Sequence, residues 1–205
     1  MNPAEEAPGN HEQKYVTGKP TPAQIREAEG NTIPDVIAPG LKVLFCGINP
    51  GLYSGAVGHH FARPGNRFWP TLHAAGFTDR ILAPHEQCLL LKHAVGITNL
   101  VARATAGAKD LKAYELVQGN QRLQAKIRQY QPQTVAILGI GAFRRAFKQK
   151  QVSVGKQTQK LAGAHLWVLP NPSGLNAHYQ LADLARLYGE LRQAVGTLYP
   201  VHHRY

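Results

Sequence analysis

The side chains best suited to chemistry gather in one glycine-rich segment, GINPGLYSGAVGHHFARPGNRFW, residues 47–69. It holds five glycines, the amide of Asn49 and several aromatic residues, among them Phe61. An aromatic ring can stack on a planar base, amides can bond to its edge, and glycines let the backbone come close to it. The segment therefore suits a neutral, planar ligand such as a nucleobase.

Other kinds of site lack their sequence patterns. Neither GxGxxG nor GxxxxGK[ST] occurs, so dinucleotide and P-loop sites are not expected. No pair of carboxylates follows an expected strand, and Ser54 and Ser173 have no evident base beside them. His59 and His60 are adjacent and should point apart, with no nearby ligand to complete a metal site. We therefore expect no cofactor and no metal ion.

The cysteines and the hydropathy of the sequence indicate the cellular compartment in which the protein is expected. Cys46 and Cys88 are too few for an iron–sulfur cluster, and both are predicted to be buried thiols in a reducing cytoplasm. No run approaches the roughly 18 apolar residues of a membrane-spanning helix, and the polar N-terminus is unlike a secretory signal. We expect a cytoplasmic protein without membrane contact, associated with the nucleoid through DNA if it is bacterial.

The net charge indicates a polyanionic partner. Lys and Arg total 23 against 12 acidic residues, which gives a formal charge of +11. Nucleic acid is the first candidate for such a protein, and simple solubility is the alternative. Many of the basic residues are spread between Arg122 and Lys160 without forming a basic tail. Any basic patch must therefore be assembled by folding.

The elements that must position these residues follow from hydrophobic patterns. Four nearly continuous apolar segments are predicted to be buried strands: 41–46, 96–101, 134–138 and 165–169. Helical patterns occupy 66–75, 84–93, 120–130 and 178–195, and GIGAFRRAF after the third strand is a tight turn into a helix. This alternation predicts a single-domain, three-layer α/β/α sandwich with a mainly parallel central sheet.

The domain boundaries are predicted from composition. Residues 1–20 should be a flexible N-terminal tail, and 21–36 a short helix with N-cap Thr21 followed by a linker. The globular domain should span 37–197, with a C-terminal tail over 198–205. Ligands of such sheets bind at the carboxyl ends of the strands. The loops GINPG, NLVARATAGAKD and NPSGLNAH should therefore converge there.

Five ordered motifs carry a family resemblance. GINPGL, GHHFARPGNRFW, GITNLVARATAGAKDL, AILG and VLPNPSGL resemble the mismatch-specific uracil-DNA glycosylase and thymine-DNA glycosylase family, within the uracil-DNA glycosylase superfamily, over residues 33–195. The resemblance implies a three-layer α/β/α fold of the uracil-DNA glycosylase type. It also implies an enzyme that flips out a pyrimidine and hydrolyses its N-glycosidic bond.

The resemblance also implies roles for the first motif. Asn49 matches the asparagine that holds the attacking water, although asparagine before Pro50 is also a common turn residue. Phe61 matches the ring that stacks on the flipped base, with a core phenylalanine as the alternative. Ile48 and its backbone would contact the base edge.

Three further residues of the base pocket follow from the same family. Asn99 resembles an asparagine that contacts the pyrimidine, and Thr105 a threonine near the attacking water; the alternatives are a strand-end residue and a turn cap. Ser54 would face the C5 edge and disfavour thymine. His60 would bond to the base or to a flanking phosphate, unless it is a partly exposed structural histidine.

The second motif resembles the loop that enters the duplex. Leu175 would be the wedge, Gly174 and Asn176 would read the orphaned guanine, and Ser173 would bind a phosphate. An exposed leucine could instead fold back onto the core. Ala177 stands where the family often has an arginine, which bears on how deeply the wedge inserts.

Together these features predict a monofunctional, cofactor-free repair enzyme. Its substrate would be uracil opposite guanine in double-stranded DNA, with thymine or etheno-cytosine excised weakly, and it would act as a monomer on G:U or G:T mismatches. A DNA-damage or abasic-site binding protein with little catalytic activity is the alternative, and an enzyme for free nucleotides is a third possibility.

Overall fold

A computed structural model of the chain describes residues 15–196. The predicted C-terminal tail, 198–205, lies outside this range, as do residues 1–14 of the predicted N-terminal tail. Within the described part of that tail, Val16 donates its N–H to the Ala56 carbonyl at 2.8 Å. This part of the predicted tail therefore contacts the short helix α2 (Leu52–Val57).

The centre of the molecule is a five-stranded sheet in the order β2-β1-β3-β5-β4. Neighbouring strands run parallel except for the β4–β5 pair, which is antiparallel. The strands are β1 (Val43–Gly47), β2 (Val95–Asn99), β3 (Thr134–Leu138), β4 (Gly155–Leu161) and β5 (Ala164–Leu169).

Alternate strand residues enter two separate cores. On β1, Val43 and Phe45 belong to one apolar cluster, whereas Leu44 and Cys46 belong to the other. Side chains alternate between the faces of a strand, so a strand that is covered on both faces must be apolar throughout. This explains why the buried strands appear in the sequence as continuous apolar runs.

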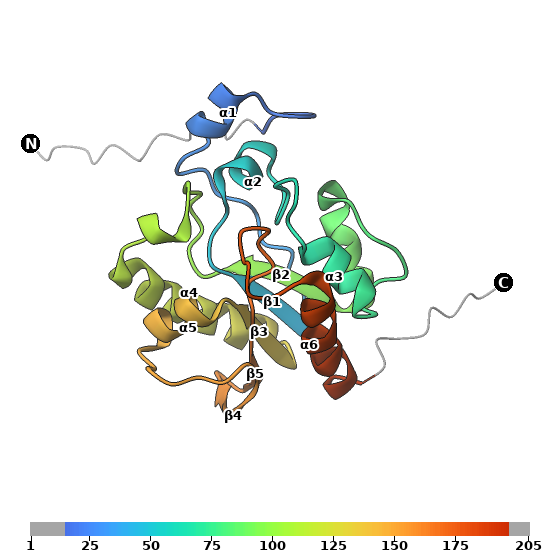
Figure 1. Cartoon of the computed structure of the whole chain (residues 1–205). Coiled ribbons are helices and arrows are strands. Elements are labelled where there is room, and N and C mark those ends of the chain that lie inside the picture. The colour runs from blue at the N-terminus through green and yellow to red at the C-terminus, as the bar shows by residue number, and fades with distance from the viewer. Residues whose placement is uncertain (1–14, 197–205) are drawn as a thin grey trace, which may run out of the picture.

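Helices cover both faces of the sheet, as Figure 1 shows. The helices α3 and α6 and the 3-10 helix η1 contribute to the first core, and α4 and α5 to the second. The predicted single-domain, three-layer α/β/α fold is confirmed. The elements are α3 (Phe68–Ala74), η1 (Pro84–His93), α4 (Ala113–Tyr130), α5 (Ile140–Phe147) and α6 (Leu181–Ala194), with a short 3-10 turn, η2 (Ala108–Asp110).

The predicted elements are present, with shifted ends. Helix α1 (Pro22–Glu27) begins at the predicted cap, where Thr21 Oγ1 accepts the Gln24 N–H at 3.3 Å. The predicted helix at 84–93 is a 3-10 helix with those bounds, and α4 begins seven residues before the predicted 120. In residues 15–196 no helix is both long and apolar enough to cross a membrane.

Strand β4, helix α2 and the 3-10 turn η2 were not predicted, and one prediction was wrong. Strand β4 carries the polar sequence GKQTQKL, because as an edge strand it exposes most of its side chains. Helix α2 has the sequence LYSGAV, which is short and contains a glycine, so it shows no helical pattern of apolar residues. Cys88 was predicted to be buried but is exposed, because η1 turns it away from the core, whereas Cys46 is buried as predicted.

Close packing of α4 against the loop after β2 allows a direct test of the fold. A Cβ on Gly119 would lie 2.3 Å from the Leu100 carbonyl oxygen, whereas a Cβ on Gly189 in α6 would meet nothing within 4 Å. Gly119→Ala should destabilise the protein by about 1–3 kcal/mol through overpacking. Gly189→Ala should stabilise it by about 0.5–1 kcal/mol, because alanine favours a helix.

Thermal and denaturant unfolding of both variants checks this prediction. Both substitutions add one methyl group inside a helix, so opposite shifts can only come from the local space. Equal shifts in the two variants would contradict the close α4–Leu100 contact.

Candidate active site

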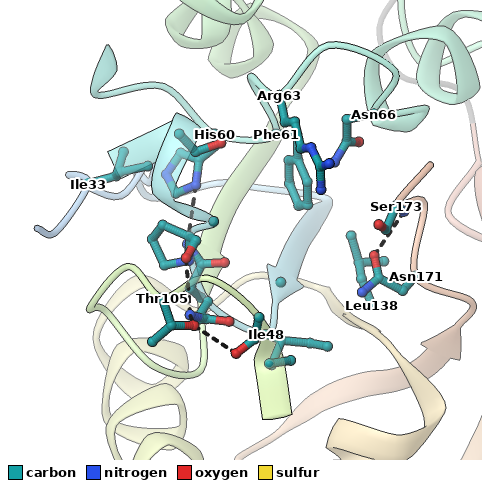
Figure 2. Close-up of a pocket in the computed structure, with 18 of the residues that line it drawn as sticks. Ile33, Ile48, His60, Phe61, Arg63, Asn66, Thr105, Leu138, Asn171 and Ser173 are labelled. Carbon is teal, nitrogen blue, oxygen red and sulfur yellow. Dashed lines mark hydrogen bonds between the residues drawn. The ribbon is translucent and has the colours of Figure 1, made fainter. Parts of the chain in front are cut away.

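The candidate site lies at the carboxyl edge of the parallel strands, where three loops meet in a cavity of about 240 Å³. In Figure 2, His60, Phe61 and Thr105 lie on one side of this cavity and Asn171 and Ser173 on the other. The predicted convergence of the loops after β1, β2 and β5 is confirmed. Nine predicted site residues line the cavity: Ile48, Asn49, Ser54, His60, Phe61, Asn99, Thr105, Ser173 and Leu175.

The amide of Asn49 is held in one orientation by protein acceptors. Its Nδ2 lies 2.8 Å from Thr105 Oγ1, 3.1 Å from the Arg103 carbonyl and 3.0 Å from the Pro50 carbonyl. Because carbonyl oxygens can only accept hydrogen bonds, these contacts show which end of the Asn49 side chain is the amide nitrogen. Within residues 15–196 no protein group donates to Asn49 Oδ1. That oxygen can therefore accept a hydrogen bond from a ligand or a water.

Thr105 connects Asn49 to the loop after β2. Its buried hydroxyl donates to the Gly107 carbonyl at 2.9 Å, which leaves the oxygen lone pairs to accept from Asn49. Its N–H donates to the Pro50 carbonyl at 3.1 Å. Arg103, whose carbonyl also binds Asn49, forms an ion pair with Glu115 on α4 that holds the pKa of this carboxyl down to about 2.

Phe61 stands in the cavity wall in a left-handed backbone conformation, with φ of 54°. Its ring stacks on Phe68 at a centroid distance of 4.0 Å and an interplanar angle of 21°. The backbone around it is fixed, since Ser54 Oγ accepts the Ala62 N–H at 3.0 Å and Trp69 Nε1 donates to the His60 carbonyl at 3.2 Å. Ring and backbone are thus fixed before any ligand enters.

His60 and Asn99 form a directed pair. His60 Nε2 lies 3.1 Å from the Pro34 carbonyl, which can only accept, so this nitrogen carries the proton. His60 Nδ1 must then accept from Asn99 Nδ2, at 3.3 Å. The opposite end of the amide, Asn99 Oδ1, lies where a Cβ on Gly47 would be, 2.4 Å away, so only glycine fits at position 47.

Burial keeps His60 neutral. The side chain is 2% exposed, so it is not a partly exposed histidine, and burial lowers its pKa to about 4. Its backbone N–H bonds to Gln87 Oε1 at 2.9 Å, and the sequence did not single out this contact from η1. A neutral His60 preserves the acceptor that orients Asn99.

Ile48 contributes mainly through its backbone. Its carbonyl accepts the Val101 N–H at 2.9 Å, and its side chain approaches Gly139 at the start of α5. Among residues 15–196 no acceptor takes the N–H of Ile48 or Asn49. The turn after β1 therefore keeps two unpaired donors at the cavity.

The second motif is a loop that Arg67 holds from the start of α3. Arg67 donates to the carbonyls of Ser173 and Tyr179 at 2.5 Å and of Asn176 at 2.8 Å. Asn171 Oδ1 accepts the Ser173 N–H at 3.0 Å, which closes a tight turn inside the loop. Sequence reasoning did not single out Arg67, although it lies in the quoted segment PGNRFW.

The tip of this loop faces solvent. Leu175 is 77% exposed and has not folded back onto the core. Gly174 passes so close to Gly65 that a Cβ would lie 2.5 Å from its carbonyl oxygen. The N–H of Asn176 donates to the Ser173 carbonyl, and its side chain bonds to Asn171 and His178, so its polar groups hold the loop together.

The cavity is polar without being acidic. None of the described residues that line it is Asp, Glu or Lys, and Arg63 is its only cationic member, at the mouth. In the described range no cluster of three His, Cys, Asp or Glu side chains could hold a metal ion. Amides, backbone groups and one ring therefore determine what this cavity binds.

The lowered pKa of His60 predicts a specific pH dependence of stability. Its folded pKa of about 4 is below its unfolded value of 6.5, so the unfolded chain takes up this proton first as pH falls. Between pH 6.5 and 4 the free energy of unfolding should decrease by about 3 kcal/mol more in the wild type than in His60→Gln. Denaturant titrations across this pH range measure the free energy of unfolding of both proteins. An equal decrease in the wild type and in His60→Gln would contradict the prediction.

Comparison with known proteins agrees with this geometry. The model of the uracil DNA glycosylase superfamily matches residues 34–192, most of the chain. A candidate uracil DNA glycosylase from Methanosarcina acetivorans, solved by NMR in solution, is similar with a TM-score of 0.47 and 16% identity, over 80% of this chain and 98% of that one. The likeness to that structure is weak, whereas the family match spans the whole sheet and every loop of the cavity. The chain belongs to the uracil DNA glycosylase superfamily.

Proposed function

We propose that this protein is a monofunctional DNA glycosylase of the mismatch-specific uracil and thymine type, which releases uracil opposite guanine from duplex DNA. The observation that carries the proposal is the fixed amide of Asn49. Its nitrogen is bound to three protein oxygens, and its oxygen has no donor within residues 15–196.

Asn49 is suited to hold the attacking water. A water that donates one hydrogen to Oδ1 is fixed in position, with a lone pair left to attack the sugar carbon C1′. A neutral amide cannot take up the proton, so it contributes by orientation rather than by strong base catalysis. The bond from water oxygen to C1′ forms as the bond from C1′ to the base nitrogen breaks, and the proton that the water loses passes to the departing uracil anion or to solvent. The products are an abasic sugar and neutral uracil.

The leaving base supplies the rest of the driving force. Glycoside hydrolysis usually needs two carboxylates, and here the described cavity lining has none. Uracil can leave as an anion, whose oxygen is stabilised by donors aimed at it, as in an oxyanion hole. The unpaired N–H groups of Ile48 and Asn49 are the donors that we assign to this role.

Asn99 supports selection of uracil over cytosine. Because His60 fixes the amide, Oδ1 can accept the N3–H of uracil, while the second hydrogen of Nδ2 can bond to the neighbouring carbonyl. Cytosine offers an acceptor at N3 and would leave these groups unpaired, a mismatch that such sites reject strongly. His60 thus acts on the base through Asn99.

Uracil is the preferred base, with thymine and etheno-cytosine as weaker substrates. Ser54 is buried in the cavity wall on α2, and its hydroxyl is tied to Ala62, so this wall cannot easily yield to a 5-methyl group. Extrusion from a mismatch costs less than from a matched pair, which favours uracil opposite guanine. Since no lysine lines the described cavity, the product is an abasic site in an unbroken strand.

Leu175 is suited to fill the space that the base leaves. It is exposed on a loop that Arg67 fixes, as wedge residues in base-flipping proteins must be. Ser173 lies beside it in the cavity wall, within reach of a phosphate of the flipped nucleotide.

The role of Asn49 is tested by Asn49→Ala. This variant should bind a G·U duplex with nearly wild-type affinity, yet release uracil at least about 100-fold more slowly in single turnover, because the water is no longer oriented. Asn120→Ala, which removes an asparagine on α4 outside the cavity, is the matched control and should keep the full rate.

Two outcomes separate the alternatives. Wild-type release by Asn49→Ala would exclude its role in holding the water. Tight binding of damaged duplex by the wild type without any release would instead favour a damage-binding protein that lacks chemistry.

The role of Leu175 is tested by comparing substrates. Leu175→Ala should slow uracil release from a G·U duplex by about tenfold or more, because duplex extrusion costs a few kcal/mol, and leave release from a single strand nearly unchanged. Leu181→Ala, another exposed leucine at the start of α6, is the control. A loss of equal size on both substrates would argue against a wedge.

A further inference from the structure

Basic residues are concentrated in one continuous part of the chain. Residues 116–182 contain nine Lys and Arg residues and no Asp or Glu. The formal charge of the whole chain is +11, so this span accounts for most of it. It includes β3, α5, β4, β5 and all but the first turn of α4.

Folding brings six of these cations onto one side of the sheet. Helices α4 and α5 pack together over one face of the sheet, where Asn120 Nδ2 donates to the Ala146 carbonyl. Residues 148–154 continue from α5 to the edge strand β4, and Gln159 on β4 bonds to Gln149. This surface, which we call the cationic face, exposes Arg122, Arg128, Arg144, Arg145, Lys148 and Lys150. Lys156 and Lys160 lie opposite Trp167 and His165 on β5, so they project from the other face of the sheet.

No acidic side chain in the described structure neutralises these six residues. Residues 15–196 contain four ion pairs, of which only Lys126–Asp35 involves the basic span. Lys126 is half-buried and also donates to Thr98 Oγ1, so it serves the interior rather than the surface. The six exposed cations are therefore available to an external anion.

The cationic face is distinct from the active-site cavity. None of its six cations lines that cavity. The face extends to Lys148 at the C-terminal end of α5, whereas α5 begins at the carboxyl edge, directly after β3. Figure 1 shows β4 far from β2 and from the loops at that edge, with α4 and α5 on one flank. A straight duplex in the cavity would contact this flank poorly.

The composition of the face indicates which polyanion it fits. Protein interfaces rely on buried apolar and aromatic anchors, and single strands bind by stacking on aromatic rings. The large hydrophobic side chains exposed in the described chain are Tyr15, Ile81, Tyr114, Leu175 and Leu181, and of these only Tyr114, in the first turn of α4, belongs to an element of the cationic face. A face with six cations and a single exposed aromatic ring suits the phosphates of a duplex.

We propose that the cationic face binds the backbone of a second DNA duplex segment while the active site engages the first. The proposal rests on the proposed function, which makes DNA the natural polyanion for this protein. Because phosphate contacts carry no sequence information, the second segment is held without regard to sequence. The protein can then bridge two segments and pass between them in its search for a mismatch.

Charge-neutralising variants with a matched control test the binding. Arg144→Gln/Arg145→Gln/Lys148→Gln removes three cations from the face. Lys92→Gln/Arg186→Gln/Arg192→Gln removes three cations from η1 and α6, of which Lys92 and Arg186 are exposed and Arg192 is half-buried. Fluorescence anisotropy measures affinity for a uracil-free duplex between about 50 and 200 mM salt. Each phosphate contact contributes about 0.9 to the slope of log affinity against log salt, so the first variant should lose about 2–3 and the control should keep the wild-type slope.

A stoichiometry measurement then distinguishes a second site from an extension of the first. Asn49→Ala saturated with a short G·U duplex should bind a second, labelled duplex, and should fail to do so when the three face substitutions are added. An unchanged slope in the face variant, an equal loss in the control, a loss confined to single-stranded DNA or RNA, or one duplex per protein would each overturn the proposal.

Uracil release separates failure of this proposal from failure of the proposed function. Single-turnover release from a short G·U duplex at saturating protein should be the same in the face variant and the wild type, because the cavity is untouched. If the wild type releases no uracil, the proposed function fails while the salt and stoichiometry results still decide on the cationic face.

Discussion

The site depends on hydrogen bonds that continue the β1–β2 pairing beyond the ends of both strands. The carbonyls of Gly47, Ile48 and Pro50 accept the N–H groups of Leu100, Val101 and Thr105. The two loops therefore run side by side, and the Asn49 amide lies between them, bound to oxygens of the second loop. A neutral amide can hold a water in one place only if its own orientation is fixed, and this pairing fixes it.

The composition of the cavity explains why the chemistry that we propose suits a narrow class of bonds. The described cavity has no acid to protonate a leaving group and no strong base to activate water. Orientation of water and stabilisation of a leaving anion suffice for a pyrimidine that departs readily, but not for an ordinary glycoside. The base recognition that we propose depends on a similar constraint, because neutral His60 orients the Asn99 amide and Gly47 leaves room for the amide oxygen.

The sequence predicted the buried parts of this structure better than the exposed parts. Continuous apolar runs identified β1, β2, β3 and β5, because strands covered on both faces have no polar side to interrupt the pattern. Edge strand β4 exposes most of its side chains, so its sequence is polar and has no apolar run by which the strand could be predicted. Asn49 and Phe61 could be singled out by motif, whereas the supports of the site could not. Arg67 and Gln87 act through contacts across the fold, which no local spacing reveals.

The most direct test of the central claim is the formation of abasic sites in a labelled G·U duplex under single turnover, with protein in excess. Hot alkali cleaves the strand wherever the base has been removed. We predict alkali-dependent cleavage at the uracil, no cleavage without alkali, and much slower cleavage of the matching A·U duplex. An intact strand after alkali, with the duplex demonstrably bound, would contradict the account.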